Sequence, residues 1–159
     1  MNPTDSTFQQ ALSKLLVEVL NGPPGNEAFV LNPGDPGLLR QLDSIDARSA
    51  STRDVPGKTT IASHVAHVLY GFQLMNRWAQ GEENPFANTD WEAAWKRTTV
   101  SESEWNALRR DLRNECDAWR KAVAARSDWD DLAASGSLAS AVHTAYHLGA
   151  IRQILATQG

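Results

Sequence analysis

The stretch 60-TIASHVAHVLYGFQLMNRW-78 decides the fold, because it combines a helical pattern of apolar residues with two of the chain's four histidines. Its apolar side chains recur every three or four residues, which is the period of one face of an α-helix. The hydroxyls of Thr59 and Thr60 can cap the start of such a helix. We therefore expect a helix from these threonines to about Gly81. Its apolar stripe consists of Ile61, Val65, Val68, Phe72 and Met75.

Three other segments have the same apolar period. They cover about residues 6–21, 101–126 and 138–157, and the last of them follows Gly136. The first two begin with residues spaced as capping boxes, Ser6 with Gln9 and Ser101 with Glu104. Since each segment is long enough for several turns and no segment alternates like a strand, the sequence predicts an all-α, four-helix bundle.

The predicted helices are joined by connections of unequal length. Residues 22–58 are rich in glycine and proline and form a long crossover, with room for one short helix at 37–46. Residues 81–100 contain 89-TDWEAAW-95, which predicts one short turn of helix capped by Thr89. No internal repeat divides the chain. We therefore expect one domain, residues 1–159, with a crossover too long for a tight hairpin.

Composition and charge exclude several classes of protein. The chain has a formal net charge of −4, which disfavours a surface that holds nucleic-acid phosphates. No apolar run reaches the roughly 18–20 residues of a membrane span, and the N-terminal run lacks a basic region and is interrupted by Glu18. The single cysteine, Cys116, lies on an apolar helical stripe and suits a reducing compartment. We expect a cytoplasmic protein with no membrane or nucleic-acid partner.

The four histidines are the candidate functional residues. His143 and His147 project about 40° apart on one helix face, because each residue of an α-helix turns by about 100°. His64 and His67 lie on the face of their helix that is expected to point into the bundle. Buried imidazoles need partners, so the four rings either form hydrogen bonds in a core or bind a metal ion. The last helix reads H-T-A-Y-H, and Thr144 stands where a zinc-protease motif has its glutamate.

The pattern T-I-x-x-H-V-x-H, followed in the last helix by H-x-x-Y-H-x-G-x-I, resembles the DinB-like superfamily of four-helix metalloproteins. The resemblance covers most of the chain, including the long first crossover and the W-x-x-x-W segment before V-S-E-x-E-W. It implies an up-down-down-up bundle and a divalent ion, variously nickel, zinc or iron, held by His67, His143 and His147. The stripe shared with Gly71 also favours His67 as the ligand on its helix. His64 is left as an extra ligand or as a residue that supports one.

The resemblance also implies a class of function, because the superfamily includes transferases that use mycothiol or bacillithiol. We expect a metal-dependent thiol S-transferase or hydrolase, acting on a low-molecular-weight thiol and an electrophilic small molecule. A metal-binding stress-response or structural protein without catalytic activity is the alternative, and a metal-free helical interaction module is a third. No catalytic residue is assigned. Asp43 and Asp46 lie in the crossover, while Tyr146 and Arg152 are expected to pack and to face solvent, respectively.

Self-association is a further expectation. Six tryptophans are many for 159 residues, and Trp91 and Trp95 fall outside the four main helices. Aromatic side chains are enriched at protein interfaces. The resemblance also implies homodimers. We therefore expect a homodimer, unless these two rings cover one end of the bundle.

Overall fold

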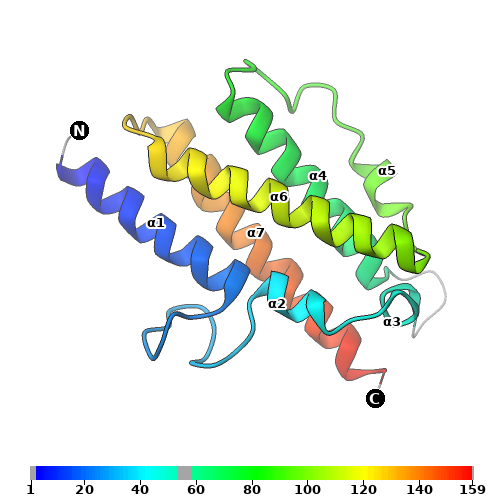
Figure 1. The fold of residues 1–159 in the computed structure, drawn as a ribbon. Coiled ribbons are helices and arrows are strands. Elements are labelled where there is room, and N and C mark those ends of the chain that lie inside the picture. The colour runs from blue at the N-terminus through cyan, green and yellow to red at the C-terminus, as the bar shows by residue number, and fades with distance from the viewer. Residues whose placement is uncertain (1–2, 54–58, 159) are drawn as a thin grey trace.

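Four long and three short helices make up the part of the chain that the computed structural model describes, residues 3–53 and 59–158 (Figure 1). The long helices are α1 (Pro3–Asn21), α4 (Ile61–Ala79), α6 (Glu102–Ala125) and α7 (Asp131–Ala156). The short helices are α2 (Leu38–Asp43), α3 (Ala47–Ser51) and α5 (Trp91–Trp95). These ranges contain no strand, and the all-α prediction is confirmed. The crossover's DVPG sequence, residues 54–57, lies outside the described residues.

The four long helices form a bundle with a long first connection. Helices α1 and α4 each pack against both α6 and α7. Helix α1 therefore lies diagonally opposite α4, and α6 lies diagonally opposite α7. In Figure 1, α1 and α7 run in one direction while α4 and α6 run in the other. This is the expected up-down-down-up order. The connection from α1 to α4 crosses the bundle and contains α2 and α3.

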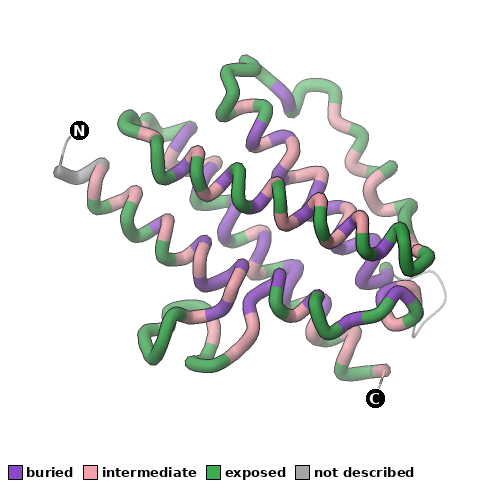
Figure 2. The backbone as a smooth tube through the Cα atoms, in the orientation of Figure 1, coloured by how far each residue is buried: buried purple, intermediate pink, exposed green. Residues whose placement is uncertain are grey.

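The bundle's core lies between these helices, whose buried faces point toward one another (Figure 2). On α6 one stripe is almost completely buried, and it consists of Trp105, Leu108, Leu112, Cys116, Trp119 and Val123. Burial raises the pKa of the Cys116 thiol, which therefore stays protonated and packs as a small apolar group. Among the described residues, no helix combines the length and apolarity needed to cross a bilayer.

The helix starts follow the predicted caps at α4 and α6. Thr60 and Ser63 form a capping box at the start of α4, and Ser101 and Glu104 form another at the start of α6. The short helix α5 begins one residue later than expected, since the side chain of Asp90 rather than that of Thr89 accepts the Ala93 N–H. These caps satisfy backbone N–H groups that have no partner within the helix.

Two predicted helix starts are wrong. Helix α1 begins at Pro3, and the Gln9 amide does not close a capping box with Ser6. Gln9 donates instead to carbonyls at the end of α6, those of Val123, Ala124 and Arg126. Helix α7 begins at Asp131 and is capped by Asp130, so Gly136 lies inside the helix rather than before it. Both helices are therefore longer than their apolar stripes predict.

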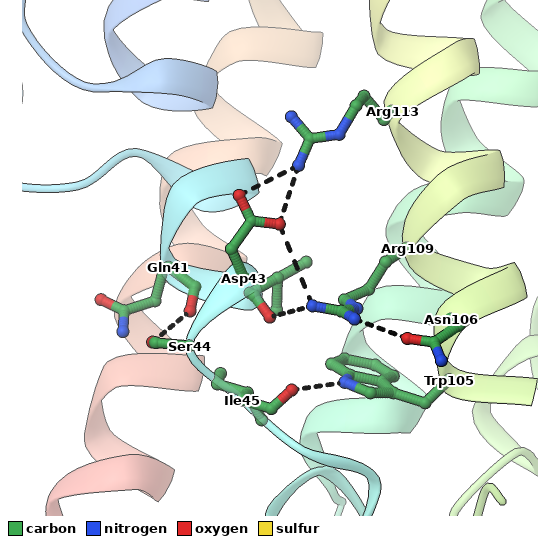
Figure 3. Close-up of polar contacts among 9 residues, drawn as sticks. Gln41, Asp43, Ser44, Ile45, Trp105, Asn106, Arg109 and Arg113 are labelled. Atoms are coloured by element: carbon green, nitrogen blue, oxygen red, sulfur yellow. Dashed lines mark hydrogen bonds and ion pairs between the residues drawn. The ribbon is translucent and has the colours of Figure 1, made fainter. Parts of the chain in front are cut away.

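The middle of the crossover is attached to α6 by polar contacts (Figure 3). Trp105 donates its indole N–H to the Ile45 carbonyl at 2.6 Å, and Arg113 binds the Asp43 carboxylate at 2.9 and 3.2 Å. Arg109 donates to the Leu42 carbonyl at 3.1 Å. These contacts hold α2 against α6 at the side of the bundle away from α5 (Figure 1).

Candidate metal centre

The four histidines meet between α4 and α7. His67 Nε2 lies 3.1 Å from His143 Nε2, and His143 Nε2 lies 3.0 Å from His147 Nε2. One ring nitrogen from each of these three residues lies within 4.8 Å of the other two. The sequence spacing therefore brings the expected rings together, one from α4 and two from successive turns of α7.

Two of the three nitrogen–nitrogen separations match those of ligands on a single small ion. Imidazole nitrogens bind zinc at about 2.0–2.1 Å, so two ligands on one ion lie about 2.8–3.4 Å apart for angles between square and tetrahedral. The His67–His143 and His143–His147 separations fall within this range. The donor set also fits, since imidazole suits zinc, nickel and iron. The cluster contains no carboxylate among the described residues.

The environment keeps these rings neutral, which is the protonation state that binds metal. Burial, with smaller contributions from the neighbouring His143 and His64, lowers the pKa of His67 to about 4. Burial also lowers the pKa of His147 to about 3, with smaller contributions from the other three histidines. Burial lowers the pKa of His64 and of His143 as well. No proton therefore has to leave these rings near pH 7 before an ion binds.

His64 occupies a different position from the other three histidines. Its Nδ1 lies 2.8 Å from Nδ1 of His147, and its Nε2 lies 3.0 Å from Oγ1 of Thr59. A neutral His147 ring that offers a lone pair at Nε2 carries its proton on Nδ1 and donates it to His64. His64 then carries its own proton on Nε2 and donates it to Thr59. This chain of hydrogen bonds thus accommodates the tautomer of His147 that binds a metal ion through Nε2.

Aromatic rings cover the cluster on the side of α5. Trp95 stacks on His67, with ring centroids 4.4 Å apart and an angle of 22° between the planes. Trp91 also contacts His67, at 5.1 Å between centroids, and Tyr146 meets His147 edge-on at 5.2 Å. These rings replace water around the imidazoles on one side. Sequence reasoning missed this role, although the four-residue spacing of the two tryptophans places both on one face of α5.

The other residues considered from the sequence have structural roles. Asp43 pairs with Arg113, and Asp46 caps α3, so neither belongs to the histidine cluster. Tyr146 was expected to pack, but its side chain is largely exposed apart from its contact with His147. Arg152 was expected to face solvent, but it is half-buried. It binds the crossover through the Asp35 carboxylate and the Pro36 carbonyl.

Comparison with known proteins identifies a family. The family model described as the DinB superfamily matches residues 7–151. This match runs from α1 into the last turns of α7 and includes all four histidines. No curated protein matches the chain, and neither does any solved structure.

Proposed function

Because the chain belongs to the DinB superfamily, we propose that it is a metal-dependent enzyme in which His67, His143 and His147 hold one divalent ion. The observation that carries this proposal is the convergence of one ring nitrogen from each histidine. Nickel, zinc and iron are the candidate ions, since each accepts imidazole ligands. A divalent ion with three neutral ligands keeps its charge and an open position, and so lowers the pKa of a thiol or water that binds there.

The proposed reaction is attack of a thiol on an electrophilic small molecule, with hydrolysis by water as the second class. The protein's own residues prepare this site before either reactant arrives. In this proposal His64 accepts the Nδ1–H of His147, which leaves Nε2 of His147 for the ion, and Trp91 and Trp95 exclude water from one side of the cluster. A dry site strengthens electrostatic interactions with charge that develops during reaction.

Metal analysis tests the first half of the proposal. We expect the purified protein, stripped and then titrated with zinc or nickel, to bind about one ion per chain. His143→Ala should abolish stoichiometric binding, and because this side chain is only half-buried its removal should leave the bundle folded. Val142→Ala is the matched control, since it changes the preceding, exposed residue of the same helix. A wild-type protein that binds neither ion would contradict the proposal.

Activity tests the second half. The metal-loaded protein should accelerate the reaction of a low-molecular-weight thiol with a chlorinated or epoxide acceptor, and His143→Ala should not. A protein that binds one ion but accelerates neither thiol transfer nor hydrolysis is instead a metal-binding protein without these activities. Anomalous scattering at the histidine cluster would identify the bound element.

A further inference from the structure

A cavity of about 370 Å³ lies beside the histidine cluster. It is bounded by α4, by α7 and by residues that precede or begin α5, and His67 and His143 form part of its wall. Its volume lies within the roughly 300–1,000 Å³ typical of small-molecule sites. A molecule in this cavity therefore lies directly against two of the three residues that converge in the cluster.

The rest of the cavity wall is almost entirely apolar. Its larger side chains are Val68, Phe72, Met75, Phe86 and Trp91. Among the described residues that line it, none is an aspartate, glutamate, lysine or arginine. The hydroxyl of Ser140 already accepts a hydrogen bond from Trp119 Nε1 at 2.9 Å and donates one to the Ser137 carbonyl at 2.6 Å. A charged group in this cavity would have no charged partner.

Small residues leave this space open. A Cβ atom at Gly71 would lie 3.8 Å from Cε1 of His143, which is ordinary contact, and a Cβ at Gly136 would meet no atom within 4 Å. Both glycines lie inside helices, where glycine costs about 1 kcal/mol relative to alanine. Neither position has a left-handed backbone that requires glycine. The absence of side chains at these positions therefore contributes volume to the cavity rather than backbone freedom.

We propose that this cavity binds the electrophilic co-substrate, and that this molecule is uncharged and mainly apolar, such as an aromatic compound. The inference rests on the proposed function, because it places the electrophile beside the ion-binding histidines. The physical reason is the wall's chemistry. Apolar rings gain by leaving water for such a wall, whereas a charge loses its hydration and gains no partner. A co-substrate that carries a carboxylate or ammonium group is therefore disfavoured in this cavity.

A set of naphthalene probes tests this inference. Binding of naphthalene, naphthalene-2-sulfonate and 2-naphthylmethylamine to the zinc-loaded protein would be measured by ligand-observed NMR. We expect naphthalene to bind at least about tenfold more tightly than either charged probe. Gly136→Leu should weaken naphthalene binding at least about tenfold, because the added side chain fills the cavity. A tenfold change in affinity corresponds to about 1.4 kcal/mol. Ala139→Leu, at a second position on the cavity wall, should act in the same direction.

Gly149→Leu is the matched control. Gly149 lies in the same helix, its added Cβ would also meet no atom within 4 Å, and it does not line the cavity. All three variants should bind zinc as the wild type does. Equal affinity for the neutral and charged probes would overturn the inference, as would unchanged naphthalene binding in both cavity variants. If zinc still binds in either case, the proposed function stands. A wild-type protein that binds neither zinc nor nickel would instead contradict the proposed function, and with it the assignment of a co-substrate.

Discussion

Two histidines three residues apart on α4 lie in different environments. His67 presents Nε2 to His143, whereas His64 presents Nδ1 to His147 from the other side of that ring. Three residues turn an α-helix by about 300°, so the two side chains point about 60° apart. This rotation places the His67 ring among the three converging histidines and the His64 ring behind His147. The two residues should therefore affect metal binding to different extents.

Alanine substitution should separate these two roles. His67→Ala removes one of three converging nitrogens and should abolish stoichiometric zinc binding. His64→Ala removes only the hydrogen-bond partner of His147 Nδ1, and outer partners of this kind are worth about 10–100-fold in metal affinity. We expect His64→Ala to bind one zinc ion with an affinity reduced within that range. Competition with a chromophoric chelator measures both affinities.

A folded His64→Ala protein that binds no zinc would contradict this assignment, especially if His67→Ala retained the ion. Circular dichroism should show unchanged helix content in both variants, so that loss of metal is not confused with loss of fold. Thr59→Val gives an intermediate test, because it removes only the outermost hydrogen bond of the chain. Its effect should be smaller than that of His64→Ala.

At the scale of the helices, α5 shows where prediction from sequence stopped. The sequence predicted a short helix at this position, but it placed Trp91 and Trp95 of this helix at an interface with a partner subunit. They are instead half-buried against the histidine cluster of their own chain. The alternative expectation, that the two rings cover part of the bundle, named one end of the bundle rather than this cluster. Helical period describes which residues share a face, but the connections on either side of α5 allow it to dock in several places. The covering rings therefore could not be assigned from spacing alone.

The crossover after α1 depends on a buried charge. Glu18 interrupts the apolar run of α1, and its side chain is only 1% exposed. Its carboxylate accepts N–H groups from Phe29, Val30 and Leu31 at 2.7–3.1 Å. Burial alone would raise the pKa of Glu18, but these three donors outweigh it and the pKa lies below its usual value. The charged carboxylate thus holds the start of the crossover against α1.

Removing this carboxylate should destabilise the protein. Glu18→Ala leaves three N–H donors without their acceptor, and we expect a loss of about 1–3 kcal/mol in the free energy of unfolding. Urea denaturation at pH 7 measures the change. Glu27→Ala is the control, because the ion pair of Glu27 with Lys14 is exposed on both sides and such pairs contribute little. A loss no larger than that of the control would contradict the proposed role of Glu18.

The stability difference between the wild type and Glu18→Ala should also depend on pH, and the pKa of Glu18 gives its sign. The pKa of Glu18 is lowered in the folded protein, so its contribution is complete above the unfolded value near 4.5 and is lost as pH falls through the folded value. The difference in stability between wild type and Glu18→Ala should therefore shrink in acid. A difference that grew as pH fell would have the wrong sign.

At the scale of the whole molecule, the bundle and its histidine cluster follow from sequence patterns, but two of its helix starts do not. Helical period and capping boxes predicted α4 and α6 to within about two residues. The start of α7 was missed because residues 131–137 lack a clear apolar stripe, although Asp130 provides a cap. The cavity was not predicted either. It depends on how α4, α7 and α5 pack, which no single segment encodes.

An exposed apolar row on α7 is the structural basis for expecting a dimer. Leu138, Val142 and Tyr146 follow one another at four-residue intervals and are 41%, 61% and 70% exposed. Successive members of this row point about 40° apart, so they form one continuous strip on the helix. Apolar strips of this kind commonly mark interfaces. With Trp91 and Trp95 committed to the histidine cluster, this row replaces them as the surface expected to meet a second copy.

Charge placed in the row should prevent self-association. We expect light scattering of the wild type at micromolar concentration to give twice the chain's 17.4 kDa, since a symmetric pair would bury the same row from both copies. Val142→Glu would place two like charges in that interface and should shift the protein to the monomer. Leu132→Glu is the control, because Leu132 is also exposed on α7 but lies ten residues, or about 15 Å along the helix axis, from Val142. A wild type that stays at 17.4 kDa would remove the dimer, and equal effects of both substitutions would place its interface elsewhere.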